Sequence, residues 1–280
     1  MILVADSGST KTTWALAGTG DKIVTEGLNP HFTPDDRFLA VCATVRSHFG
    51  TCTSAFRLHF YGAGCGNAKQ RHRTEKLLRE GLDINEVHVE TDMLGACRAA
   101  SGNHPGLVGI LGTGSNACYY DGQTIRCQPT STGYILGDKG SANHVGRILL
   151  NDYLTHRMPT PTRRLFHAVH KLSDAALIDA VYHQPNPNRF LASLAPFAVQ
   201  HLDDDEYCDR VIRDALRSWY LDPLQPLRQR AGCREGTLNV VGGFAKAIEP
   251  TLRRCFDADG LTVGTVMADP TEGLLAFHSH

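Results

Sequence analysis

A short polar turn near the start of the chain has the residue types of a phosphate-binding loop. The apolar run Ile2-Leu-Val-Ala5 leads into Asp6-Ser-Gly-Ser-Thr-Lys-Thr12, in which glycine and hydroxyl residues follow a carboxylate. Backbone N–H groups of such a turn can face phosphate oxygens, while the Asp6 carboxylate can hold hydrated Mg²⁺. An ordinary hairpin with a solvated aspartate would have the same residues. The chain has no G-x-x-x-x-G-K-[ST] sequence, so this turn is not a Walker loop.

A second turn of this kind follows about 106 residues later. Gly112-Thr-Gly-Ser-Asn116 comes directly after the apolar run Leu107-Val-Gly-Ile-Leu111 and aligns with Asp6-Ser-Gly-Ser-Thr10 without a gap. Residues 112–117 also fit the G-x-G-x-x-G/A dinucleotide fingerprint, but that fingerprint requires a helix to begin at its second glycine. Because a strand and a hairpin turn follow instead, the pattern favours a second phosphate-binding hairpin over a Rossmann site. Ser115 and Asn116 would then be free to meet a polar ligand.

Three further segments place polar residues or glycines where predicted strands end. Asp92 follows the strand-like run Glu86-Val-His-Val-Glu90 and precedes a helical pattern, so it could cap that helix, accept a proton from a hydroxyl group, or do both. Asp138 lies in a glycine-punctuated loop over 131–141, which an Asp-Lys turn would also explain. The pair Gly242-Gly243 follows an apolar strand, where a flat adenine or a ribose could approach the backbone.

The elements that must position these residues form a repeated pattern. Residues 1–27 and 107–126 both read as three short strands joined by turns, and strands alternate with helices up to residue 100. After Gly140 helical patterns dominate, at 142–154, 172–181, 190–202 and 207–219, before strands return at 237–241 and 262–267. We therefore expect a duplicated α/β chain. Its first domain covers 1–104 and its second covers 105–269, with a helical insertion at about 142–235 and a final helix over 270–280 that packs back on the first domain.

Composition narrows the class of protein. The 280 residues are 42% hydrophobic and 20% charged, as in an ordinary globular protein, and 28 Lys+Arg against 29 Asp+Glu give no charge bias toward nucleic acid or a membrane surface. The sequence has no signal-peptide pattern and no long apolar span, so we expect a cytoplasmic protein. The nine cysteines are scattered without C-x-x-C spacing, and the histidines lack ligand spacing, so neither disulfides nor a zinc or iron–sulfur site is predicted.

The motifs together resemble the N-acetylglucosamine kinase family, which is related to the BadF/BadG/BcrA/BcrD-type ATPases and belongs to the sugar kinase, Hsp70 and actin superfold. The resemblance is carried by Asp6–Thr12, Thr91-Asp92, Leu111–Asn116, Leu136–Ser141 and Val241–Gly243, and it is thin over 150–235. It implies an α/β fold of two similar ribonuclease H-like domains with a nucleotide and sugar cleft between them. It also implies an ATP-dependent kinase, with Mg²⁺, that phosphorylates the 6-hydroxyl of N-acetylglucosamine or a related amino sugar.

The resemblance also implies roles for single residues. Asp92 would be the catalytic base, and Asp6 would hold Mg²⁺ through water. The residues implied for ATP and its phosphates are Gly8, Ser9, Thr10, Lys11, Thr113, Gly114, Gly242 and Gly243. The residues implied for the sugar are Asn29, Asp92, Ser115, Asn116 and Asp138. The expected partners are therefore ATP and an amino sugar, with no nucleic acid and no membrane, and a homodimer is left open.

Two departures from the family pattern leave alternatives open. Relatives usually carry Glu where this chain has Lys139, and a position that is often Gly is Ser131 here. Lys139 could strengthen phosphate attraction, alter the choice of sugar, or mark a sensor that binds sugar and nucleotide without turnover. A further alternative is the activator ATPase of acyl-CoA dehydratases. That class uses cluster-binding cysteines, whereas Cys65 and Cys97 are isolated by spacing.

Overall fold

The computed structural model describes residues 1–8, 10–50, 55–232 and 236–279, and the chain divides into two compact units. Unit 1 consists of Met1–His104, Gly122–Thr124 and Asp269–His280, and unit 2 consists of Pro105–Asp121 and Ile125–Ala268. The chain therefore leaves unit 1 after His104, returns to it briefly at Gly122–Thr124, and returns again at Asp269.

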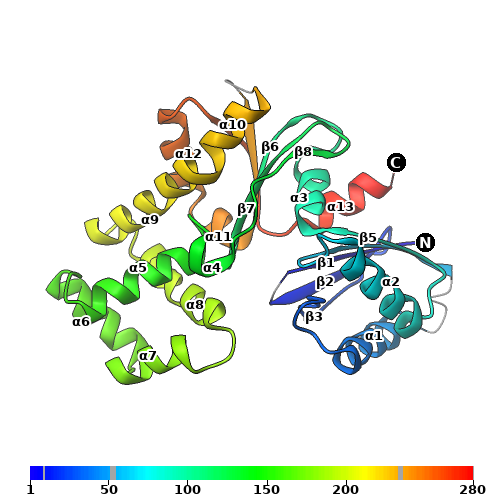
Figure 1. Cartoon of the computed structure of the whole chain (residues 1–280), viewed down its shortest axis with the longest axis horizontal. Helices are drawn as coiled ribbons and strands as arrows, with labels where there is room; N and C mark the ends of the chain where they lie inside the picture. The colour runs from blue at the N-terminus through cyan, green and yellow to red at the C-terminus, as the bar shows by residue number, and fades with distance from the viewer. Residues whose placement is uncertain (9, 51–54, 233–235, 280) are drawn as a thin grey trace. The chain divides into compact units, whose positions relative to one another are not determined.

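Unit 1 is a five-stranded mixed sheet with helices on both faces (Figure 1). Its elements are β1 (Ile2–Ser7), β2 (Lys11–Leu16), β3 (Lys22–Glu26), α1 (Asp35–Phe49), β4 (Arg57–Gly62), α2 (Ala68–Leu82), β5 (Glu86–Thr91), α3 (Asp92–Ser101) and α13 (Thr271–His278). The strand order is β3-β2-β1-β4-β5; β1, β4 and β5 are parallel, and β2 runs antiparallel to both of its neighbours. Helices α1 and α2 pack together on one face, and α3 and α13 pack together on the other.

The central strand of unit 1 explains this layering. Leu3, Val4 and Ala5 of β1 are fully buried, as expected for a strand that is covered on both faces and therefore reads as a continuous apolar run. Trp14 and Phe60 lie in the same core, with their ring centroids 6.0 Å apart. The polar turn that follows β1 is thus anchored by a strand that cannot shift without exposing this core.

Unit 2 repeats the same sheet topology. Its elements are β6 (Gly106–Leu111), β7 (Ser115–Tyr120), β8 (Ile125–Cys127), α4 (Gly133–Leu136), α5 (Ala142–Leu154), α6 (Thr160–His170), α7 (Asp174–Tyr182), α8 (Pro187–Gln200), α9 (Glu206–Trp219), η2 (Tyr220–Leu224), α10 (Gln225–Ala231), β9 (Thr237–Val241), α11 (Gly243–Ala247), α12 (Glu249–Ala258) and β10 (Thr262–Met267). The order β8-β7-β6-β9-β10 places the third, second, first, fourth and fifth strands in sequence, as in unit 1. The α/β fold with two similar domains is thereby confirmed.

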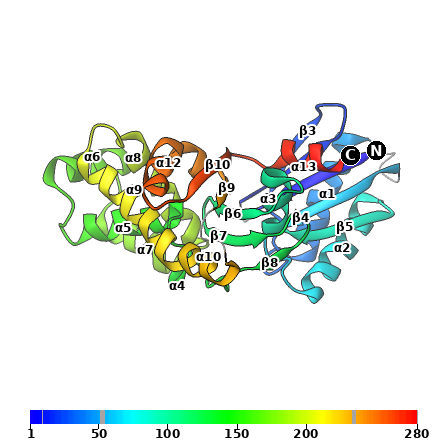
Figure 2. The same cartoon turned by 90° about the horizontal axis from the view of Figure 1, so that it is seen from above.

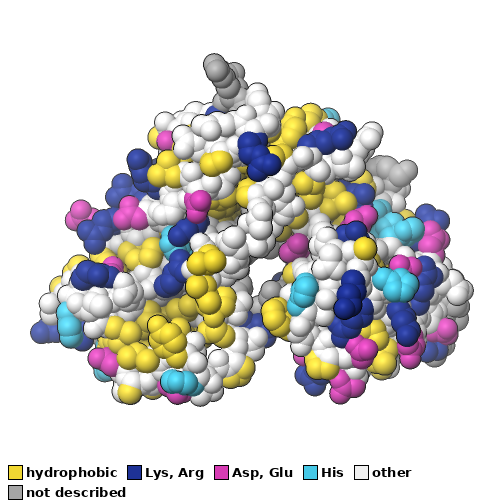
Figure 3. Space-filling model, in the orientation of Figure 1, with side chains coloured by type: hydrophobic (Ala, Val, Ile, Leu, Met, Phe, Trp, Pro, Cys, Tyr) yellow, Lys and Arg dark blue, Asp and Glu magenta, His cyan; other side chains and the backbone are white. Residues whose placement is uncertain are grey.

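The helices α5 to α9 gather to one side of the unit 2 sheet (Figure 2). The sequence pattern misses α6, because the prolines around it read as a linker. Pro161 lies in the first turn of α6, and Pro187 begins α8; a missing N–H costs nothing at these positions. Exposed large hydrophobic side chains occur on α6, α7 and the segment between them: Leu165, Val169, Leu172, Ile178 and Tyr182. Figure 3 shows hydrophobic side chains gathered over this helical part.

No helix among the described residues has both the length and the apolar character that a bilayer crossing needs.

Candidate functional site

Unit 1 brings four of the expected site residues to one edge of its sheet. Asp6 lies near the end of β1, Asn29 follows β3, and Asp92 begins α3 directly after β5. Lys11 begins β2, which runs the opposite way, so it lies at the same edge. Ligand sites in open α/β sheets form at this carboxyl edge, because loops and helix N-termini converge there.

Three carboxylates influence one another at this edge. Burial, reinforced by the negative charges of Asp269 and Asp92, raises the pKa of Asp6 to about 7, and Lys11 opposes this rise. Burial also raises the pKa of Asp92. Burial by itself would raise the pKa of Asp269 too, but hydrogen bonds from Thr271 and the charge of Lys11 outweigh it and lower the pKa. The three carboxylates at this edge therefore carry more negative charge than the Lys11 ammonium can balance. An excess of negative charge of this kind favours binding of a cation.

The role of Asp92 as a helix cap is corrected by the structure. Thr91 is the N-cap of α3, and its hydroxyl accepts a hydrogen bond from the Leu94 N–H at 3.2 Å. Asp92 is the first helical residue, and one carboxylate oxygen accepts the Met93 N–H at 2.8 Å. The cap is therefore provided by Thr91, and among the described residues no other residue donates a hydrogen bond to the second carboxylate oxygen of Asp92.

The turn after β1 offers fewer N–H groups than its sequence suggests. The Gly8 N–H donates to the Lys11 carbonyl at 3.0 Å and closes the hairpin, so it is not available to a phosphate. Ser9 lies outside the described residues, and Thr10 is exposed. The Lys11 ammonium lies 3.5 Å from Asp269 and is 59% exposed, which leaves it able to reach an anion.

Asn29 belongs to a compact loop between β3 and α1. Its backbone carbonyl accepts the Phe32 and Thr33 N–H groups at 3.0 and 2.8 Å, and its side-chain oxygen accepts the His31 N–H at 3.0 Å. Because a backbone N–H can only be accepted by the amide oxygen, the orientation of the amide is fixed. Among the described residues the Asn29 Nδ2 group has no acceptor, so it is the group left for a ligand.

Unit 2 carries its own glycine turn at the matching edge of its sheet. The Thr113 carbonyl accepts the N–H of Asn143 at 3.1 Å and its amide Nδ2 at 2.7 Å. The prediction that the two turns align without a gap is wrong, because the turns differ in length. Four residues separate the last paired positions of the first hairpin, and three separate those of the second. Ser7 pairs with Thr12, whereas Leu111 pairs with Ser115. The two hairpins are similar in position but not in register.

The two glycines of the pair after β9 have different surroundings. Gly242 has φ +136°, and a Cβ there would lie 2.2 Å from the Leu111 carbonyl oxygen, so only glycine fits between β6 and the start of α11. A Cβ on Gly243 would meet no described atom within 4 Å. Packing among the described residues of unit 2 therefore does not require glycine at position 243.

Asp138 is built into a hydrogen-bond network in unit 2. One carboxylate oxygen accepts the Ser115 N–H at 3.2 Å, and the other accepts Nδ2 of Asn143 at 2.9 Å. The Ser115 hydroxyl donates to the Lys139 carbonyl at 2.6 Å, so it is not free as expected and can only accept from a ligand. Asn116 Oδ1 accepts the Ala117 N–H at 2.9 Å, which leaves its Nδ2 as a donor.

Three residues of these networks were missed by the sequence analysis. Asp269 binds Lys11 and Thr13 from the far end of the chain, Asn143 joins Thr113 to Asp138, and Arg73 contacts the Asn29 loop. Asp269 carried a usable signal, since it precedes a proline and a helical pattern, as a capping aspartate often does. Asn143 and Arg73 lie within helices and have no local signature.

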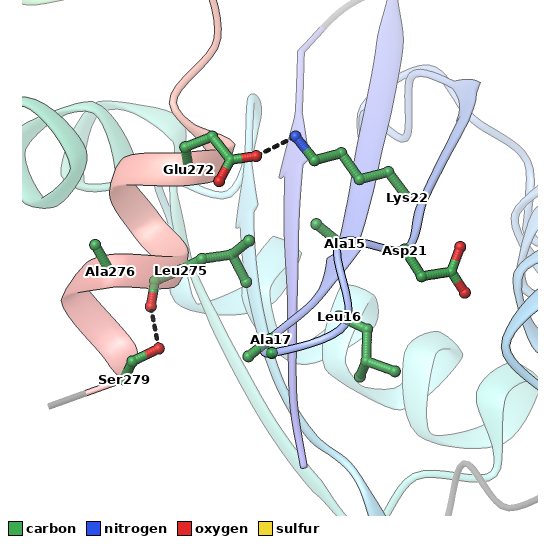
Figure 4. Close-up of a pocket in the computed structure, with 11 residues that line it drawn as sticks. Ala15, Leu16, Ala17, Asp21, Lys22, Glu272, Leu275, Ala276 and Ser279 are labelled. Carbon is green, nitrogen blue, oxygen red and sulfur yellow. Dashed lines mark hydrogen bonds and ion pairs between the residues drawn. The ribbon is translucent and has the colours of Figure 1, made fainter.

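A separate cavity of about 260 Å³ lies in unit 1 between the β2–β3 hairpin and α13 (Figure 4). Leu16 and Leu275 contribute apolar walls, and Lys22 and Glu272 form an ion pair at its side. None of the expected site residues lines it. In the part of the chain that the structure describes, no group of three or more His, Cys, Asp or Glu side chains is arranged to hold a metal ion directly.

Comparison with known proteins gives matches among solved structures. No family model and no curated protein matches the chain. A candidate N-acetylglucosamine kinase from Porphyromonas gingivalis is 34% identical, with a TM-score of 0.92 over 99% of this chain and 98% of that chain. Another, from Chromobacterium violaceum, is 20% identical, with a TM-score of 0.77 over 99% and 98% of the two chains. A ROK family glucokinase from Streptomyces griseus, in complex with glucose and AMPPNP, is 15% identical, with a TM-score of 0.55 over 99% and 98%. The last two show likeness of fold alone.

Proposed function

The chain belongs to the N-acetylglucosamine kinase family, and from this membership we propose that it transfers the γ-phosphoryl group of ATP to the 6-hydroxyl of N-acetylglucosamine or a related amino sugar. The observation that carries the proposal is the cluster of Asp6, Asp92 and Lys11 at one edge of the unit 1 sheet. A base, a cation-holding carboxylate and an anion-binding ammonium are the groups that phosphoryl transfer to a hydroxyl requires.

Asp92 is the proposed base. Its carboxylate accepts the proton of the sugar hydroxyl while the hydroxyl oxygen forms a bond to the γ-phosphorus, and the bond from that phosphorus to the β–γ bridging oxygen breaks to release ADP. Burial raises the pKa of Asp92, and a raised pKa makes the ionised carboxylate a stronger base. The Met93 N–H fixes one of its oxygens, so the other has a defined direction.

Mg²⁺ would be held by Asp6 through water. The group fits, because Mg²⁺ prefers oxygen ligands, keeps several waters and is commonly bound by one or two carboxylates together with substrate phosphates. The absence of a direct three-ligand group among the described residues is compatible with such water-mediated binding. When bound, the ion would neutralise charge on the phosphates. It would also offset the effects of burial and of the Asp269 and Asp92 charges, which raise the pKa of Asp6.

The remaining assignments extend the proposal to the rest of ATP and to the sugar. For ATP, we assign Ser9, Thr10, Lys11, Thr113 and Gly114 to the phosphates, Gly8 to the turn that shapes their loop, and Gly242 and Gly243 to the nucleotide. For the sugar, we assign the Nδ2 groups of Asn29 and Asn116 as donors and the oxygens of Asp138 and Ser115 as acceptors. This mixture of donors and acceptors suits the several hydroxyl groups of a hexose.

Family membership favours transfer over the two alternatives. An activator ATPase would need cysteines that hold a cluster, whereas Cys65 and Cys97 are both buried inside the protein. A sensor would bind sugar and nucleotide without chemistry, and it would have no use for a base beside the cation-holding carboxylate.

The test is ADP release with a panel of hexoses and amino sugars, measured with and without Mg²⁺ for the parent and for Asp92→Asn. We expect Mg²⁺-dependent turnover with an amino sugar as the best acceptor, and loss of turnover but retained sugar binding in the variant. Sugar-induced thermal stabilisation without ADP release from the parent would support the sensor instead. Full activity of Asp92→Asn would remove its role as the base.

A further inference from the structure

We propose that Arg73, on α2, is a positioning residue for the loop that carries Asn29 and thereby sets the affinity for the sugar, a role that rests on the proposed function. Arg73 lies 44 positions after Asn29 in the sequence, on helix α2, whereas Asn29 lies in the loop between β3 and α1. The contacts that connect them are all within unit 1.

The guanidinium of Arg73 donates hydrogen bonds to two separate points of the Asn29 loop. Nη1 donates to the Pro30 carbonyl at 2.6 Å, and Nη2 donates to the Thr33 carbonyl at 2.8 Å. Nε donates to the Asp35 carboxylate at 2.9 Å, at the first residue of α1. A planar guanidinium can direct N–H groups to three acceptors in fixed directions, which a lysine ammonium cannot reproduce.

This grip determines what Asn29 can offer. The loop between Pro30 and Thr33 folds back so that Asn29 accepts two backbone N–H groups and donates its own N–H to the Thr33 hydroxyl at 3.1 Å. Its side-chain oxygen is taken by the His31 N–H. Only the Nδ2 donor remains without an acceptor among the described residues. A loop released at the Pro30 and Thr33 carbonyls would lose this single orientation.

Helix α2 also fixes the backbone segment on which the Asn29 side chain packs. Gly64 has φ +85°, and a Cβ there would lie 2.4 Å from Asn29 Oδ1, so the Asn29 amide packs directly on backbone. Arg71, two residues before Arg73 on α2, donates to the Cys65 carbonyl at 3.1 Å and fixes that segment. Helix α2 thus fixes both the loop that carries Asn29 and the surface on which it rests.

The chain offers two matched controls. Asp35→Asn removes the charge partner that ties Arg73 to α1 but leaves the bonds to the Pro30 and Thr33 carbonyls in place. Arg79→Ala removes another arginine of α2, which pairs with Glu75 on the helix surface. If Arg73 only joined α1 to α2, Asp35→Asn would reproduce its loss.

The experiment compares steady-state kinetics of the parent, Arg73→Lys, Arg73→Ala, Asp35→Asn and Arg79→Ala, with the fold checked by circular dichroism. For Arg73→Lys we expect the KM for the amino sugar to rise about tenfold or more, with the KM for ATP within about twofold of the parent, because lost bonds to a charged group weaken binding by about this factor. The two controls should stay within about twofold in both constants. Arg73→Lys keeps the charge, so it reports even if Arg73→Ala fails to fold.

A double variant decides whether Arg73 acts through Asn29. Adding Arg73→Lys to Asn29→Ala should raise the KM for the sugar by less than about twofold, since the donor that Arg73 positions is already gone. Independent effects that multiply would overturn the proposal, and so would a folded Arg73→Lys with an unchanged sugar KM or with equal losses for sugar and ATP. If the parent proves to bind amino sugars without turnover, the proposed function fails, and the same comparison is made on sugar dissociation constants by calorimetry.

Discussion

Asp6→Asn should stabilise the free protein at neutral and alkaline pH while it abolishes phosphoryl transfer. The Asp6 carboxylate is largely withdrawn from water beside Asp92 and Asp269, and among the described residues no donor makes a hydrogen bond to it. Folding therefore places a negative charge in this cluster that the Lys11 ammonium only partly offsets. A neutral amide of the same shape removes that cost but cannot hold hydrated Mg²⁺.

The magnitude follows from the pKa of Asp6, which folding raises from 3.8 to about 7. The unfolded chain loses this proton near pH 3.8 and the folded chain only near pH 7, so the folded state binds more protons between these values and its stability falls as pH rises. At about 1.4 kcal/mol per pH unit, the full cost above pH 7 is on the order of 4 kcal/mol. Between about pH 5.5 and 8.5, about 2 kcal/mol of it should develop.

The assay is urea unfolding of the metal-free parent and Asp6→Asn at pH 5.5 and 8.5. The parent should lose about 2 kcal/mol more than the variant over this interval. Asp214→Asn, a change at an exposed aspartate of unit 2, is the control and should follow the parent. Parallel pH profiles for Asp6→Asn and the parent would refute the inference that Asp6 is ionised at a cost.

Three further changes have distinct expected outcomes. Asp92→Asn should lower kcat by about 10²–10⁴-fold without lowering the free energy of unfolding. Thr91→Ala should lower the free energy of unfolding by about 1 kcal/mol in denaturant unfolding, because Thr91 caps α3. An equal loss of stability in both variants would contradict this assignment. Burial lowers the pKa of His59 to about 3 and that of His278 to about 4, so the unfolded chain takes up protons first and stability should fall as pH drops from 6.5 toward 4. Thermal melts of His278→Leu should show a weaker fall than the parent, and an equal fall would count against this account. Asn143→Ala should lower the free energy of unfolding by about 1–3 kcal/mol and raise the KM for both ATP and sugar, because its amide joins Thr113 to Asp138. A change in only one KM would show that the amide does not couple these two residues.

Local sequence was enough for much of the fold and for its family. Apolar runs such as Ile2–Ala5 and turn residues such as Gly112-Thr-Gly114 act over a few residues, so the repeated strand pattern predicted two similar α/β domains, which the sheet orders confirm. The same motifs predicted the N-acetylglucosamine kinase family, and the 34% identical structure confirms it. The proline-flanked α6 was missed because proline ends helices as readily as it begins them.

Only the tertiary structure decided which groups surround the candidate site residues. Lys11 meets Asp269 across 258 positions of sequence, and Arg73 meets the Pro30 carbonyl across 43. No local pattern encodes such pairs, because they arise only when strands align and helices pack. The same holds for the hydrogen-bonding capacity that Asn29 and Ser115 still offer, because folding brings the partners that occupy Asn29 Oδ1 and the Ser115 hydroxyl hydrogen. Sequence therefore determined where chemistry could occur, and packing determined which atoms remain to carry it out.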